Sequence, residues 1–88
     1  MRNVMISRKN ENDKDETCFS KTPVPQCPEG SRKVKSVKQQ VEFHCLYTNL
    51  ESTKKMLKLY KTKPLDKMMS KKTDRVQEIE AELECREQ

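Results

Sequence analysis

The chain has 88 residues, of which 32% are hydrophobic and 38% are charged, and its formal net charge is +5 at pH 7. This length allows one small domain, and a composition with no Trp, two Phe and two Tyr excludes a large hydrophobic core. No apolar run approaches the roughly 18 residues that span a membrane, so the sequence predicts no transmembrane segment.

The first part of the chain is rich in Asn and charged residues. Because residues 7–17 hold no large apolar side chain, we expect residues 1–17 to form a disordered, solvated linker. An extended strand is predicted over about 18–28, where several prolines fix φ and push the preceding residues out of the helical region. Gly30, the only glycine, predicts a turn after this strand.

The clearest periodicity predicts a second strand over about 34–47. One of its faces is apolar, and the other is charged or polar. The apolar face consists of Val37, Val41, Phe43, Cys45 and Tyr47. An amphipathic helix is predicted next, over about 50–62, with Asn49 as its N-cap and with Pro64 preventing its continuation.

The last segment, 76–85, is ambiguous between strand and helix. Its residues alternate between apolar side chains and Glu, as in a strand, yet Glu, Gln and Ala are also good helix formers. The fold expected overall is a small disulfide-stapled α+β module over residues 18–88, with one or two strands and one helix.

The four cysteines bear on the cellular compartment of the protein. An even number in so short a chain predicts two disulfide bonds between Cys18, Cys27, Cys45 and Cys85, and the sequence leaves all three pairings open. Zinc would require closely spaced ligand pairs, which are missing here, and four reduced cysteines in a cytosolic protein remain the other alternative. Disulfides favour a secreted protein, and without a leader at Met1 we expect a fragment of a longer precursor.

No pattern in the sequence predicts catalysis. His44 is the only histidine, it has no nucleophile motif around it, and we expect it to lie at the surface. A single glycine cannot form a phosphate-binding loop. We therefore expect no enzymatic activity, no metal site and no cofactor in this segment.

A cluster of basic residues is the best candidate for a binding surface. It could bind a heparin-like polymer, nucleic acid or anionic lipid, although the scarcity of Arg and aromatic residues argues against sequence-specific nucleic-acid recognition. The cluster consists of Lys54, Lys55, Lys58, Lys61, Lys63, Lys67, Lys71, Lys72 and Arg75. The glutamates between positions 77 and 88 could instead neutralise it, which would leave a solvated charged face.

Two short runs carry a resemblance to a known family. CFSKTPVPQCPEG at 18–30 and VEFHCL at 41–46 resemble the carboxy-terminal tail of insect-type vitellogenins, which follows their von Willebrand factor type D domain. The resemblance is good over 17–50 and loose over 51–85. Some members carry a cysteine where this chain has Ser31 and a paired cysteine near the end, where this chain has only Cys85.

The resemblance implies a function that belongs to a larger protein. Vitellogenins are secreted yolk lipoproteins that transport lipid and store nutrients, and the parent protein binds the lipid. This segment would then be a non-catalytic terminal module whose partner is the rest of the parent lipoprotein, especially the neighbouring von Willebrand factor type D domain.

Overall fold

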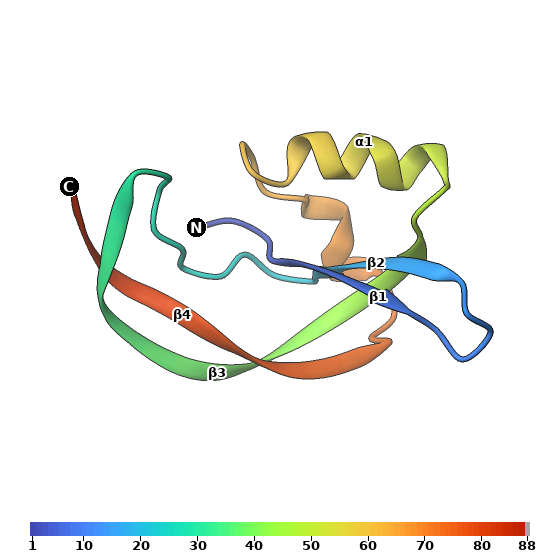
Figure 1. The fold of residues 1–88 in the computed structure, drawn as a ribbon, viewed down its shortest axis with the longest axis horizontal. Helices are drawn as coiled ribbons and strands as arrows, with labels where there is room; N and C mark the ends of the chain where they lie inside the picture. The colour runs from blue at the N-terminus through green and yellow to red at the C-terminus, as the bar shows by residue number, and fades with distance from the viewer. Residues whose placement is uncertain (88) are drawn as a thin grey trace.

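The computed structural model describes residues 1–87, which form a curled antiparallel sheet of four strands with one α-helix and one 3-10 helix (Figure 1). The elements in chain order are β1 (Met5–Lys9), β2 (Asp15–Ser20), β3 (Ser31–Tyr47), α1 (Glu51–Leu59), η1 (Asp66–Ser70) and β4 (Arg75–Glu87). Neighbours in the sheet follow the chain order, β1-β2-β3-β4. The expectation of an α+β module with one or two strands is therefore wrong.

The first hairpin occupies the region expected to be a linker. β1 pairs antiparallel with β2, and the Asn10 side-chain oxygen closes the turn by accepting the backbone N–H groups of Asn12 and Lys14 at 2.9 and 3.0 Å. Asp13 supplies the left-handed turn position, with φ of 61°. Residues 1–17 thus hold all of β1 and the start of β2, which corrects the linker expectation.

The strand expected over 18–28 is also shorter than predicted, because β2 ends at Ser20. Prolines lack the N–H that a continuous ladder needs, so the chain leaves the sheet after β2 and makes only isolated contacts. Residues 24–27, which we call the strap, contact both the segment before β1 and the outer strand β4. Val24 exchanges backbone hydrogen bonds with Arg2, and the Pro25 carbonyl accepts the Glu82 N–H at 2.9 Å. The strap therefore joins the start of the chain to β4 across the open side of the curl.

The core lies on the concave side of the sheet. Its fully buried members come from β2, the strap, β3 and β4, and they are Cys18, Val24, Val41, Phe43 and Ala81. The face predicted for β3 is buried only in its middle, since Val37 is 45% and Tyr47 49% exposed. β3 is longer than the core, and its first half continues with β4 as a twisted two-stranded ribbon (Figure 1).

The other face of β2 is covered by the segment that connects β3 to β4. Phe19 is fully buried there, and its ring centroid lies 5.8 Å from that of Tyr60 at the end of α1. The buried Thr53 hydroxyl donates to the Tyr47 carbonyl at 2.8 Å and fixes the start of α1. The Asn3 side-chain oxygen accepts the Leu65 N–H at 2.8 Å, which holds the approach to η1.

The predicted helix is present but begins differently, and the structure resolves the segment that was ambiguous between strand and helix. α1 lies within the expected 50–62 but follows Leu50, without a side-chain cap, so the prediction of Asn49 as N-cap is wrong. The ambiguous segment 76–85 is a strand, because it pairs with β3 over its length except at an irregularity around Leu83. Gln88, the last residue of the expected module, lies outside the described residues. Within residues 1–87, no helix combines the length and apolar character needed to cross a membrane.

Candidate functional site

Two disulfide bonds organise the fold. Cys18 is bonded to Cys45, and Cys27 is bonded to Cys85. The first joins directly paired positions of β2 and β3, whereas the second ties the strap to β4. Residues 1–87 contain no free cysteine, which confirms the expectation of two disulfides, selects one of the three pairings and overturns the alternative of four reduced thiols.

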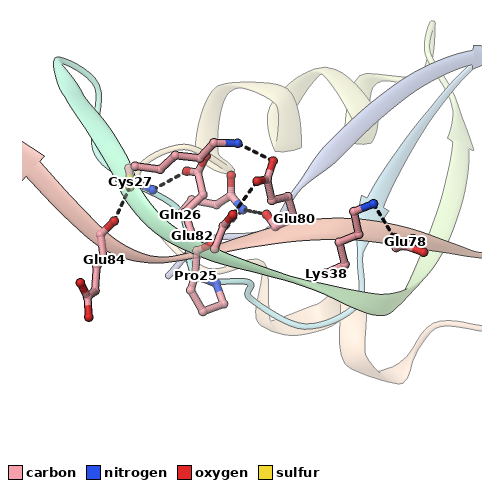
Figure 2. A network of polar contacts seen from close by, with 10 residues as sticks. Pro25, Gln26, Cys27, Lys38, Glu78, Glu80, Glu82 and Glu84 are labelled. Carbon is pink, nitrogen blue, oxygen red and sulfur yellow. Dashed lines mark hydrogen bonds and ion pairs between the residues drawn. The ribbon is translucent and has the colours of Figure 1, made fainter.

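Polar contacts reinforce the attachment of the strap to β4. The Cys27 N–H donates to a Glu82 carboxylate oxygen at 2.7 Å, and the Gln26 side-chain amide donates to the Glu80 carbonyl at 3.3 Å (Figure 2). The strap is therefore held to β4 by backbone and side-chain hydrogen bonds as well as by the second disulfide. Within residues 1–87, no group of three or more His, Cys, Asp or Glu side chains could hold a metal ion.

The acidic residues of β4 find their partners on β3. Lys38 lies 3.5 Å from the Glu78 carboxylate (Figure 2), and Glu80 accepts hydrogen bonds from Lys33 and Ser36. The hydrogen bond from Lys33, followed by that from Ser36, lowers the pKa of Glu80 below its usual value. No local motif marks these β3 residues, and only the pairing of β3 with the glutamates of β4 could identify them.

The nine basic residues predicted as a binding surface are spread over the connection between β3 and β4. Three lie on α1, three lie in the turn and η1, and three lie in the approach to β4 or at its first residue. In that order they are Lys54, Lys55 and Lys58, then Lys61, Lys63 and Lys67, then Lys71, Lys72 and Arg75.

Few of these basic groups meet an acidic partner. Lys54 lies 3.8 Å from Glu51, and Lys72 lies 3.4 Å from Asp74. Within residues 1–87, six lysines form no ion pair within 4.0 Å: Lys55, Lys58, Lys61, Lys63, Lys67 and Lys71. Arg75 differs from the lysines, because it is partly buried and its Nε atom has no hydrogen-bond partner there. The basic cluster is thus not neutralised by the acidic end of the chain.

His44 lies in a small polar cluster at the junction of β3 and β4. Its Nδ1 atom is 2.9 Å from an Asp74 carboxylate oxygen and 3.0 Å from the Lys72 carbonyl, and the same Asp74 oxygen accepts the Cys45 N–H at 2.7 Å. Partial burial raises the pKa of Asp74, but the hydrogen bonds from Cys45 and Lys72 and the nearby charge of His44 hold it below its usual value. With its side chain 12% exposed, His44 is more enclosed than the expected surface position.

A shallow hollow of 480 Å³ adjoins this histidine. Its lining includes Arg8, Glu16 and Leu50 in addition to the His44 cluster, but no serine, threonine or free cysteine. An imidazole hydrogen-bonded to a carboxylate needs a nucleophile on its other side to act in covalent catalysis. The contacts present instead hold the β3–β4 junction together.

Comparisons of the chain with protein-family models, with curated proteins and with solved structures found no match. The family assignment therefore stays a hypothesis that depends on the two short runs quoted above. The lysine cluster and the pair of disulfides are the features that a functional account must explain.

Proposed function

We propose that this chain is a non-catalytic structural module at the carboxy-terminal end of a secreted yolk lipoprotein of the vitellogenin type. It would support lipid transport and nutrient storage through the whole protein, which would bind the lipid elsewhere. Its partner would be the rest of the parent lipoprotein, especially the preceding von Willebrand factor type D domain.

The observation that carries this proposal is the position of the disulfides. Cys18–Cys45 links the two runs that resemble the vitellogenin tail, and Cys27–Cys85 links the first run to the end of the chain. Two disulfides in a chain with so small a core are typical of secreted domains, which need covalent support to remain folded. This supports an extracellular location for the module.

The lengths of the closed loops support a structural role. The bonded cysteines are 27 and 58 residues apart in sequence, so the two closed loops together include residues 18–85, and β1 lies outside both. Closing loops of this length removes conformational freedom from the unfolded chain and stabilises the folded one by about 3–4 kcal/mol each. Such a module suits a terminal cap that has to survive storage outside the cell.

The reading frame that encodes the chain provides the test. Sequencing the full transcript should reveal, upstream of Met1 and in the same frame, a lipid-transfer region and a von Willebrand factor type D domain. A stop codon shortly before Met1 would overturn the proposal.

The protein in its native location offers a second test. An antibody against this segment should detect a large protein in extracellular fluid, and alkylation without reductant should find no free thiol in the segment. Detection of a small cytosolic species with reactive thiols would contradict both the parent and the compartment.

A further inference from the structure

α1 presents several lysines on the side that faces away from the sheet. At about 100° per residue, Lys54, Lys58 and Lys61 fall within an arc of about 60°, and Lys55 extends the arc on one side. Tyr60 keeps helical dihedral angles, φ −62° and ψ −25°, so the turn continues to Lys61. We call Lys55, Lys58 and Lys61, which form no ion pair, the lysine face; Lys54 lies between Lys58 and Lys61 around the helix but pairs with Glu51.

The opposite side of α1 is occupied by the sheet, which fixes the direction of the lysine face. Thr53 is fully buried and bonded to the Tyr47 carbonyl, and Tyr60 packs against Phe19. On the helix these anchors lie about 120° from the middle of the lysine arc, and the nearest lysine, Lys61, has its Nζ atom 6.0 Å from the centre of the Tyr60 ring. The side of α1 that bears the lysines therefore has a fixed orientation relative to the sheet (Figure 1 shows α1 above β1 and β2).

The charge of the lysine face has no internal counterpart within residues 1–87. Lys55, Lys58 and Lys61 form no ion pair, and the only acidic residue of α1, Glu51, lies 3.8 Å from Lys54. The glutamates of β4, the expected counterpart, are engaged by β3 instead. Like charges one turn apart cost a few tenths of a kcal/mol, and an anion bound between them would offset this repulsion.

Lys54 lies towards the amino-terminal end of this side of α1. It lines a hollow with Asp13, Lys14 and Asp15 of the first hairpin, and Lys9 pairs with both of these aspartates. The lysines without an ion pair follow Lys54 along the chain, so the proposed contact runs from Lys55 towards Lys61 and the turn that follows.

We propose that the lysine face binds the sulfate groups of an extracellular sulfated polysaccharide, independently of the parent protein suggested above. Lysines spaced along a helix suit a linear polymer with closely repeated anions, and two disulfides place the chain where such polymers occur. Nucleic acid is less suitable, because the face lacks arginines and exposed rings for stacking. Insertion into an anionic membrane would need the apolar side of α1, and part of that side packs against the sheet through Thr53 and Tyr60.

The test compares two triple variants of the full, oxidised chain on immobilised heparin. The first replaces the face, as Lys55→Ala, Lys58→Ala and Lys61→Ala. The second replaces three lysines that already pair with carboxylates elsewhere, as Lys9→Ala, Lys33→Ala and Lys38→Ala. Both variants lose three positive charges, so any difference between them reports position and not net charge. Circular dichroism and a thiol count verify that each variant is folded and oxidised.

The expected result is a large difference in affinity between the two variants. Counterion release gives each lost contact a factor of about 4–5 near 0.15 M salt, so the face variant should bind heparin roughly 50- to 150-fold more weakly. The paired-lysine variant should stay within about threefold of the wild type, because exposed ion pairs contribute little. Equal losses in both variants, or no wild-type binding at this salt concentration, would overturn the proposal.

Three further probes identify the ligand. Desulfated heparin should not bind, whereas mixed-sequence duplex DNA and vesicles containing phosphatidylserine should bind more weakly than heparin at the same ionic strength. Binding to desulfated heparin, or stronger binding to DNA or vesicles, would refute a sulfated polysaccharide as the ligand.

Discussion

Replacing Asn3 by Ala tests whether the first residues belong to the folded module. The buried Asn3 amide donates to the Ser20 carbonyl at 2.6 Å and accepts the Leu65 N–H at 2.8 Å. Alanine would leave both backbone groups without these partners, and an unsatisfied buried group costs about 1–3 kcal/mol. Because the Leu65 contact is only partly buried, we expect the free energy of unfolding to fall by about 2–4 kcal/mol in total.

Urea denaturation of the oxidised chain, followed by circular dichroism, measures this loss. With an m-value of about 1 kcal/mol/M for a domain of this size, the midpoint should decrease by roughly 2–4 M. Asn12→Ala is the matched control, since Asn12 is exposed in the hairpin turn and should change stability by less than about 0.5 kcal/mol. If Asn3→Ala were as mild as the control, the packing of the amino-terminal segment against β2 and η1 would be refuted.

Three other variants, one of them with a matched control, test the cross-links, the polar junction and the core. Replacing Cys27 and Cys85 together by Ser opens a 58-residue loop and should lower the free energy of unfolding by about 4 kcal/mol in urea titrations, with Cys18–Cys45 intact; an unchanged midpoint would contradict this. Asp74 has a lowered pKa in the folded chain, so its stabilising contribution is present above the unfolded pKa, near 3.8, and is lost as the pH falls below that value through the folded pKa. The stability advantage of the wild type over Asp74→Asn should therefore shrink as the pH falls. An advantage that grew as the pH fell would contradict a lowered pKa of Asp74 in the folded chain. Phe43→Ala should cost about 3–5 kcal/mol because Phe43 is fully buried, whereas Tyr47→Ala, at a position 49% exposed, should cost much less by the same assay.

Much of β3 could be predicted because apolar and polar residues alternate clearly in the part of the strand that reaches the core. Val41 and Phe43 alternate with charged residues and are buried in the core. Val37 belongs to the same pattern but lies in the ribbon beyond the core, where no other layer covers it. Alternation predicts the face on which a side chain lies, but it does not predict how far the core extends.

The first hairpin could not be predicted, because β1 offers only Met5 and Ile6 as large apolar residues. Its stability comes from pairing with β2 and from the Asn10 turn, which no local pattern reveals. β4 remained ambiguous for a similar reason. Only pairing with β3 places Glu78 and Glu80 beside lysines and thereby settles the segment as a strand.

The candidate site was visible in the sequence only as a list of basic residues. That Lys58 and Lys61 lack partners depends on where the acidic strand folds, which is a tertiary property. The cysteines likewise predicted two bonds, but Cys27 could be assigned to Cys85 only after the strap had been placed against β4.

The central claim is that two specific disulfides close this curled sheet, and peptide mapping under non-reducing conditions tests it most directly. Proteolysis of the oxidised chain followed by mass spectrometry should yield one linked pair containing Cys18 with Cys45 and another containing Cys27 with Cys85. Peptides that link Cys18 with Cys27, or that carry free thiols, would contradict the account.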